Sequence, residues 1–200
     1  MIGVSQPDGF DTLRCAIARE FRSPMEPVRN RSRLGRCAVL FVDLRGYTTL
    51  CEDLAPSAVA ILLDEFYAVI GDAIGHAGGK IQNLAGDAVM AVFGLEEPTP
   101  GGDGRAAVES GRRMIAAFQA VGDRWEQLHG VTTGIGVGVH VGAVMESDLG
   151  PPTLRRPTLV GDTVNVAARL CHRARAGEVN GFDHQRIARL ECDCGFHFHA

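Results

Sequence analysis

The sequence predicts an α+β fold of ferredoxin-like kind, in which helices pack against one face of a mostly antiparallel sheet. Short apolar segments typical of strands alternate along the chain with longer segments of helical periodicity. Two strand-like segments are separated only by Ala85, Gly86 and Asp87, a turn that indicates an antiparallel hairpin. The order of elements is strand, two helices, hairpin, helix, one or two strands, helix and strand.

Each element has a local signal. The segment 36–42 is a near-continuous apolar run, as expected of a strand buried on both faces. Ser57 is a typical helix start, and Gly78 is typical of a helix end. In chain order we expect a strand over 36–42, a helix that starts near Tyr47, a helix from Ser57 to Gly78, strands over 80–84 and 88–93, a helix over 105–128, a strand over 133–141, a helix over 162–174, and a weaker strand and helix over 177–190.

The strand predicted over 133–141 alternates strictly between two kinds of residue. One face carries Ile135, Val137, Val139 and Val141, and the other carries Gly134, Gly136, Gly138 and His140. A strand face made of glycine lets a neighbouring helix or backbone approach closely. We therefore expect another element to pack tightly against the glycine face.

Composition excludes several classes of protein. With 200 residues, 46% apolar residues and a net charge of -4, the chain can bury a full core, and its charge does not favour nucleic acid as a partner. It has no apolar run long enough to span a membrane and no secretory signal, which predicts a cytoplasmic protein. The six cysteines lack a framework spacing, so we expect reduced thiols.

The first 35 residues differ from the rest. Phe10, Leu13, Ile17 and Phe21 have helical spacing, which suggests a short amphipathic helix. A segment rich in proline and arginine follows, without periodicity, and is typical of a linker. We therefore expect a helix and linker over 1–35 and the main domain over 36–200.

Two aspartates are candidate metal ligands. Asp43 ends the strand over 36–42, and Asp87 lies in the hairpin that should pair beside that strand. Alone, Asp43 could cap the next helix and Asp87 could serve the hairpin turn. Turn formation alone does not require both aspartates at these positions. Mg²⁺ requires few protein ligands when a triphosphate supplies the others.

The chain has neither a P-loop nor a dinucleotide-binding glycine motif, so phosphate must be bound elsewhere. Gly46 allows a tight turn after Asp43, and backbone amides at the start of the next helix can bind phosphate oxygens. The candidate phosphate-binding residues are Leu44, Arg45, Gly46, Tyr47 and Thr48.

A third motif lies in the helix over 162–174. Asp162 is suited to its N-cap, and Asn165 and Arg169 are four residues apart, so they share a helical face. An amide and a permanent cation on one face can bind a ribose and a phosphate. The alternative is a solvated polar face without a role in binding.

The segments FVDLRGYT, NLAGDAVMAVFG and VGDTVNVAARL, in this order, resemble the signatures of the class III nucleotidyl cyclase catalytic domain, over 36–181. This resemblance implies conversion of ATP to 3',5'-cyclic AMP and pyrophosphate in a head-to-tail homodimer with shared active sites. One protomer would hold two Mg²⁺ or Mn²⁺ ions with Asp43 and Asp87. The other would supply the base-recognition residues, with Asn165 for the ribose and Arg169 for the transition state.

The base-recognition positions depart from the adenylyl cyclase pattern. The resemblance places Asn83 where those enzymes usually carry lysine, and Thr158 at the second position. Lys80 is three residues from Asn83, so strand alternation predicts that it points to the opposite face. The glutamate–cysteine pair of guanylyl cyclases is also missing. ATP is favoured, with a relaxed-specificity or guanylyl cyclase as the alternative.

Two further alternatives concern the whole domain. Members of this family continue into further strands, whereas this chain ends at CDCGFHFHA, so a catalytically weak nucleotide-binding module is the alternative function. The cysteines and histidines of that segment suggest either a zinc site or a half-buried strand. A diguanylate cyclase shares the topology, but it carries GGDEF or GGEEF at the hairpin, unlike AGDAV here.

Overall fold

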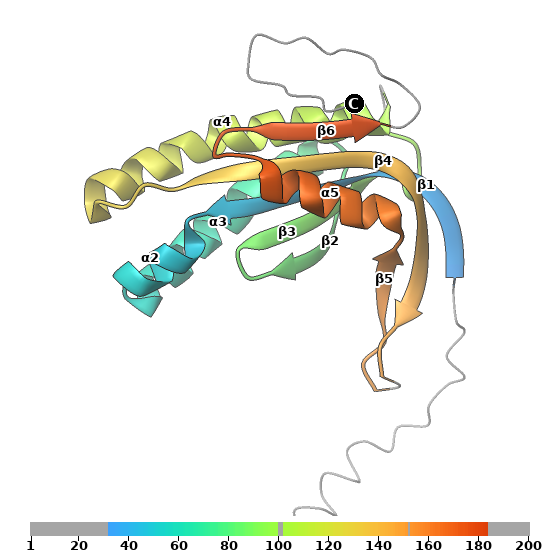
Figure 1. The fold of residues 1–200 in the computed structure, drawn as a ribbon, viewed down its shortest axis with the longest axis horizontal. Coiled ribbons are helices and arrows are strands. Elements are labelled where there is room, and N and C mark those ends of the chain that lie inside the picture. Colours follow the sequence, from blue (N-terminus) through green and yellow to red (C-terminus); the bar gives the residue numbers. More distant parts are fainter. Residues whose placement is uncertain (1–31, 100–101, 152, 184–200) are drawn as a thin grey trace, which may run out of the picture. The chain divides into compact units, whose positions relative to one another are not determined.

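The computed structural model describes residues 32–99, 102–151 and 153–183. These residues form a six-stranded sheet with flanking helices (Figure 1). In chain order, the elements are β1 (Ser32–Arg45), α2 (Tyr47–Asp53), α3 (Pro56–His76), β2 (Lys80–Ala85), β3 (Ala88–Phe93), α4 (Asp103–His129), β4 (Gly134–Leu149), β5 (Arg156–Val160), α5 (Asp162–Arg173) and β6 (Val179–Asp183).

The sheet is mostly antiparallel, as predicted. Its strands follow the order β2-β3-β1-β4-β5, and β6 pairs with β4. β1 is antiparallel to both β3 and β4, whereas β6 runs parallel to β4. This arrangement of sheet and helices confirms the predicted α+β fold class. β1 starts at Ser32, so the last residues of the expected linker belong to the sheet.

Helices cover both faces of the sheet. α3 and α4 pack on one face, where Phe66 and Phe118 lie in the larger hydrophobic cluster with Val137 of β4. α5 packs on the other face, where Ala167 lies in a smaller cluster with Val39 of β1. Figure 1 shows α5 in front of the sheet and the paler α3 behind it. The expectation that all helices lie on one face was wrong, because the glycine face of β4 is also covered.

Gly138 sets the approach of α5 to β4. A Cβ atom at Gly138 would lie 2.1 Å from the amide nitrogen of Cys171 and 2.4 Å from the carbonyl oxygen of Ala167. Both are backbone atoms, so no side-chain rotation can relieve the clash. The close packing predicted for the glycine face is therefore confirmed.

Gly138→Ala is expected to lower the free energy of unfolding by about 3 kcal/mol, the upper end of the usual range for overpacking, because α5 must move away from β4. Gly75→Ala is the matched control, since a Cβ there meets nothing within 4 Å. That change, in an exposed part of α3, should stabilise the protein by about 0.5 kcal/mol. Urea unfolding measures both effects, and a Gly138→Ala protein as stable as the wild type would contradict this packing.

Two helix starts differ from the sequence prediction. α3 starts at Pro56 rather than at Ser57, because the fixed φ of proline suits the first helical position. α5 has Gly161 as its N-cap, with φ 143°, and Asp162 is its first residue. A Cβ at Gly161 would lie 3.2 Å from the carbonyl oxygen of Ala143. Close packing and a positive φ together favour glycine there over a capping side chain.

Some expectations fall on other parts of the chain. The helix expected around Phe10 to Phe21, the helix expected after β6, and the zinc or strand arrangement of Cys192, Cys194, His197 and His199 all lie outside the described residues. Within them, Cys37, Cys51 and Cys171 are free thiols. None of the described helices combines the length and the apolar character that crossing a membrane requires.

Candidate active site

The two candidate metal aspartates lie at the same edge of the sheet. Asp43 is near the end of β1, and its register partner on β3 is Ala88, the residue after Asp87. The amide of Leu44 donates to the carbonyl of Asp87 at 3.0 Å, which fixes the hairpin turn beside the end of β1. The pairing of β1 with β3 therefore brings Asp43 and Asp87 together.

The charges around Asp43 oppose one another. Burial raises the pKa of the Asp43 carboxyl above its ordinary value; the guanidinium of Arg45 lowers it, ionised Asp87 raises it, and His172 lowers it. The net direction is upward. A partly desolvated carboxylate beside a second carboxylate is stabilised by a bound cation. The site is therefore electrostatically suited to a metal ion.

Two carboxylates are a small donor set. No group of three or more histidine, cysteine, aspartate or glutamate side chains is placed to hold a metal within the described part of the chain. Mg²⁺ commonly binds one or two protein carboxylates and completes its octahedron with water and substrate phosphates. Asp43 and Asp87 thus fit a Mg²⁺ or Mn²⁺ ion that is shared with a triphosphate.

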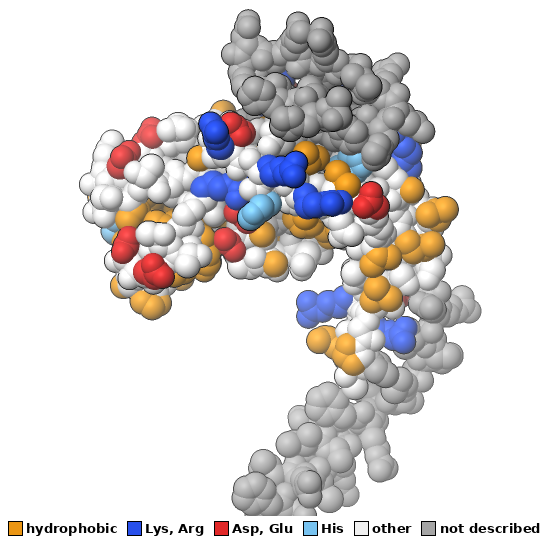
Figure 2. Space-filling model, viewed as in Figure 1, with side chains coloured by type: hydrophobic (Ala, Val, Ile, Leu, Met, Phe, Trp, Pro, Cys, Tyr) orange, Lys and Arg blue, Asp and Glu red, His pale blue; other side chains and the backbone are white. Residues whose placement is uncertain are grey.

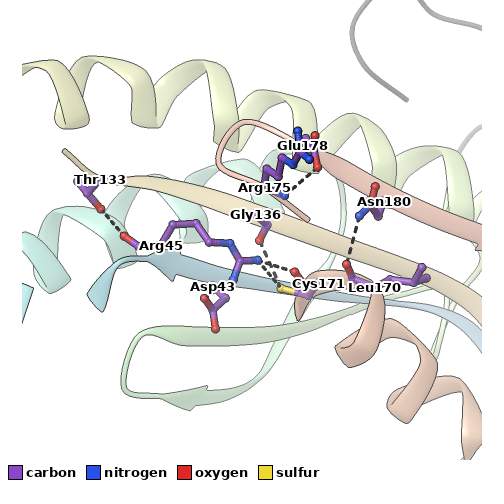
Figure 3. Close-up of polar contacts among 9 residues, drawn as sticks. All are labelled: Asp43, Arg45, Thr133, Gly136, Leu170, Cys171, Arg175, Glu178 and Asn180. Atoms are coloured by element: carbon purple, nitrogen blue, oxygen red, sulfur yellow. Dashed lines mark hydrogen bonds and ion pairs between the residues drawn. The ribbon is translucent and has the colours of Figure 1, made fainter. Parts of the chain in front are cut away.

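The side chain of Arg45 points into the protein, toward Asp43 and α5 (Figure 3). One terminal nitrogen donates to Oδ1 of Asp43 at 2.8 Å, and the other donates to the carbonyl of Cys171 in the last turn of α5. The side chain is 23% exposed. A direct contact between this guanidinium and a phosphate would require these bonds to break.

The turn after β1 has the predicted form. Gly46 has a φ of 77°, in the left-handed region, and α2 starts at Tyr47. The first amides of a helix have no acceptor within it, so those of Tyr47 and Thr48 can bind phosphate oxygens. The amide of Leu44, by contrast, is already bonded to the carbonyl of Asp87. The phosphate-binding role of this turn stays a prediction.

Asn165 and Arg169 are exposed on the same helix, α5. Arg169 lies 3.6 Å from the carboxylate of Asp162 and donates to the carbonyl of Asn165 at 3.3 Å. Figure 2 shows basic side chains gathered over α5. Among the described residues, no hydrogen bond or ion pair joins Asn165 or Arg169 to Asp43 or Asp87. The candidate residues of one chain therefore fall into two groups, Asp43 with Asp87 and Asn165 with Arg169, that make no direct contact.

A β-bulge determines which face Lys80 occupies. Lys80 pairs with Val92 and Asn83 pairs with Met90, with a register shift between the two pairs. Val92 and Met90 are two residues apart on β3, so they and their partners share a face. The expectation that Lys80 and Asn83 point to opposite faces was wrong. The ammonium of Lys80 is nevertheless bound to Glu96 at 2.6 Å.

The two base-recognition candidates lie on different strands. Asn83 is exposed on β2, and Thr158 lies on β5, at the opposite end of the strand order. The hydroxyl of Thr158 donates to the carbonyl of Arg156 at 3.0 Å. No described contact joins Asn83 to Thr158, and their action on one base stays a prediction.

Sequence reasoning missed two residues that support the site. The hydroxyl of Tyr67, on α3, donates to the carbonyl of Gly86 in the hairpin turn. The thiol of Cys171 donates to the carbonyl of Gly136 at 3.3 Å. Tyr67 lies within an otherwise apolar helical pattern and Cys171 has the spacing of a core residue, so neither carried a signal for this role.

Two cavities lie away from the aspartates. One, of about 380 Å³, is between α3 and α4 and is lined in part by Asp72, His76 and Arg113. The other, of about 190 Å³, lies near the end of β3. Neither is lined by Asp43 or Asp87. Neither cavity therefore belongs to the edge of the sheet where the aspartates lie.

Known proteins resemble this chain over most of its length. Residues 30–199 match the adenylate and guanylate cyclase catalytic domain. An adenylate cyclase of Anabaena cylindrica is 33% identical over 139 residues, which are 68% of this chain and 26% of that protein. The solved structure of the adenylyl cyclase CyaB from P. aeruginosa is 30% identical, with a TM-score of 0.68 over 74% of this chain and 77% of CyaB.

A guanylyl cyclase is equally similar in structure. The guanylyl cyclase Cya2 is 27% identical, with a TM-score of 0.67 over 75% of each chain. Likeness to both kinds of enzyme does not select a base. The chain spans about a quarter of the length of the Anabaena relative, 26%. From the match over most of its length and from these structures, we conclude that the chain belongs to the family of class III adenylate and guanylate cyclase catalytic domains.

Proposed function

We propose that two copies of this chain form a nucleotidyl cyclase that converts ATP, in preference to GTP, to a 3',5'-cyclic nucleotide and pyrophosphate. The observation that carries the proposal is the pairing of β1 with β3, which brings Asp43 and Asp87 to one edge of the sheet. Asn165 and Arg169 are displayed separately on α5. A head-to-tail homodimer would bring the aspartates of one chain to the α5 helix of the other, so that each dimer has two shared sites.

Each residue has a role in this proposal. Asp43 and Asp87 would hold two Mg²⁺ or Mn²⁺ ions. The amides of Tyr47 and Thr48 bind phosphate oxygens at the start of α2. From the partner, the amide of Asn165 orients the ribose. Arg169, also from the partner, stabilises the charge that develops on the α-phosphoryl group.

The reaction is an in-line displacement. When bound, the metal ions lower the pKa of the ribose 3'-hydroxyl and neutralise the triphosphate. The 3'-oxygen gives its proton to water and attacks the α-phosphorus, and the bond between that phosphorus and the pyrophosphate oxygen breaks, so that pyrophosphate leaves. Arg169 must release Asp162 to serve the partner's site, which costs little because the ion pair is exposed, with 69% of the Arg169 side chain accessible.

The direct test is product analysis. The purified protein is incubated with Mn²⁺ and either ATP or GTP, and products are identified by mass. We expect cyclic AMP and pyrophosphate from ATP, and less cyclic product from GTP. Binding of ATP in calorimetry without any cyclic product would contradict the proposal and favour the alternative of a nucleotide-binding module.

Asn83 is expected to set the preference between bases. An amide both donates and accepts hydrogen bonds, whereas lysine only donates and glutamate only accepts. Asn83→Lys should therefore raise the ratio of kcat/KM for ATP over GTP, and Asn83→Glu should lower it, each by about tenfold, since a hydrogen bond to a charged group contributes about 1.5 kcal/mol. Steady-state kinetics with both nucleotides measures the ratio. Equal ratios in all three proteins would remove Asn83 from base recognition.

A further inference from the structure

Arg45 joins β1, which carries Asp43, to α5, which carries Asn165 and Arg169. It belongs to β1, where it follows Asp43 by two residues, and its guanidinium reaches the last turn of α5 (Figure 3). One terminal nitrogen bonds to Asp43 Oδ1 at 2.8 Å, and the other bonds to the carbonyl of Cys171. The planar fork of arginine allows both bonds at once. The side chain of Arg45 therefore connects the candidate metal ligand Asp43 to α5.

The path of Arg45 depends on a missing side chain in β4. A Cβ atom at Gly136 would lie 2.2 Å from a terminal nitrogen of Arg45 and 2.6 Å from its Nε. Any larger residue at this position would push the guanidinium away from Cys171. Gly136 thus opens the space through which Arg45 passes between β4 and α5.

The far end of this connection is electrostatically suited to a cation. The last carbonyls of a helix lack partners within the helix and carry the negative end of its dipole. At that end of α5, the guanidinium of Arg45 donates to the carbonyl of Cys171, which also accepts from the amide of Ala174 at 3.0 Å. Its Nε is buried without a hydrogen-bond partner, which costs free energy. The arrangement is therefore not explained by hydrogen-bond satisfaction alone.

The near end leaves one oxygen of Asp43 available. Arg45 occupies Oδ1, and no described residue donates a hydrogen bond to Oδ2. Carboxylates that bind metals are usually oriented by a hydrogen bond to their second oxygen, and loss of such a partner commonly lowers metal affinity by about 10- to 100-fold. Arg45 has the geometry of such a partner.

We propose that Arg45 is a positioning residue: it orients Asp43 for metal binding and fixes the end of α5 relative to Asp43. This inference rests on the metal site of the proposed function. In a head-to-tail dimer, Asp43 and α5 of one chain would serve different active sites. Arg45 would then connect the two sites of the dimer through each chain.

The test measures Mn²⁺ binding to the full chain without nucleotide, by the electron paramagnetic resonance signal of free Mn²⁺. Arg45→Lys keeps the charge but cannot hold both partners, and Arg45→Met removes the charge as well. Both variants should bind Mn²⁺ about 10- to 100-fold more weakly. Arg173→Met, which removes an exposed cation from the same turn of α5, is the matched control and should leave the affinity unchanged.

The sign of the Arg45→Met effect separates two roles. Removing a cation close to Asp43 should by itself strengthen Mn²⁺ binding, because a repulsion is lost. Weaker binding therefore means that orientation outweighs charge, as we propose. Tighter binding would show that Arg45 competes with the metal for Asp43, and unchanged binding would show a purely structural role. Either result overturns the inference.

A second measurement follows the connection to α5. Mn²⁺ should slow amide hydrogen exchange in the last turn of α5 in the wild type, and this effect should disappear in Arg45→Lys and in Gly136→Ala, which blocks the path of Arg45. Folding of each variant is checked by circular dichroism. An undiminished Mn²⁺ effect in folded Arg45→Lys would overturn the inference.

These measurements are separate from those of the proposed function. Binding that survives in Asp43→Ala, or no binding by the wild type, would contradict the metal site and this inference with it. Cyclic product from ATP combined with unchanged Mn²⁺ affinity in Arg45→Lys and Arg45→Met would overturn only the role of Arg45.

Discussion

Asp43→Ala and Arg169→Ala are each expected to abolish most cyclase activity, and a mixture of the two proteins is expected to recover it. Loss of Arg169 removes one preorganised donor to the transition state, which should slow turnover by about 10²- to 10³-fold. Loss of Asp43 should be at least as damaging, because it removes a metal ligand. In a head-to-tail dimer, the heterodimer contains one site built from intact Asp43 and intact Arg169.

The expected recovery can be calculated from symmetry. Random exchange of subunits at equal concentrations gives half heterodimers, each with one intact site of two, so activity should reach roughly a quarter of the wild-type value per chain. Production of cyclic nucleotide in the mixture is the measurement. No recovery in a mixture shown to contain heterodimers would rule out the shared site.

A matched mixture controls for non-specific rescue. In a mixture of Asp43→Ala and Asp87→Ala, each chain lacks one of the two aspartates that it would contribute to a single site. Every site in that heterodimer lacks one aspartate, so activity should stay low. Recovery in this mixture would mean that Asp43 and Asp87 act in different sites, contrary to the pairing of β1 with β3.

Local sequence patterns were sufficient to predict the hairpin and a closely packed face on β4, although not that α5 would cover this face. The turn at Gly86, between two apolar segments, determined that β2 and β3 pair, and the pairing of β1 with β3 then brings Asp87 to Asp43. The glycine alternation in β4 predicted close packing, which the contact between Gly138 and α5 confirms. These features depend on neighbouring residues, so the sequence contains the information directly.

Features that depend on distant partners could not be predicted in this way. The bulge that puts Lys80 on the same face of β2 as Asn83 changes strand alternation through a single extra residue, and no local signal marks it. The path of the Arg45 side chain depends on the space beside Gly136 and on the carbonyl of Cys171. Both residues lie more than 90 positions away from Arg45 in the chain. Sequence spacing placed Arg45 in a phosphate-binding turn, whereas tertiary contacts turn it inward.

Asp87→Asn is expected to stabilise the metal-free protein while it abolishes activity. Ionised Asp87 raises the pKa of Asp43, so the two carboxylates repel each other when both are charged. Removing one charge relieves this repulsion, by less than about 1 kcal/mol because Asp43 is partly exposed, at 34%, and water screens the interaction. Turnover should fall by about 10²- to 10³-fold, since a catalytic metal contributes several kcal/mol.

The pH dependence follows from the same repulsion. A carboxyl with a raised pKa in the folded state contributes stability that is lost as the pH rises from its ordinary pKa through the raised one. In Asp87→Asn one cause of the raised pKa is absent, so less stability should be lost over that interval. The variant should therefore be more stable than the wild type at neutral pH, and the difference should shrink as acid protonates Asp43.

Thermal unfolding, measured once in a chelator and once in Mn²⁺, tests both the gain in stability without metal and the loss of stabilisation by metal. In the chelator, the melting temperature of Asp87→Asn should exceed that of the wild type. Mn²⁺ should raise the melting temperature of the wild type more than that of the variant, because only the wild type retains both ligands. Asp64→Asn, at an exposed position on α3, is the control and should change neither quantity. A metal site must hold like charges together before the metal arrives, so a variant that is less stable without metal would contradict the assignment of Asp87 to that site.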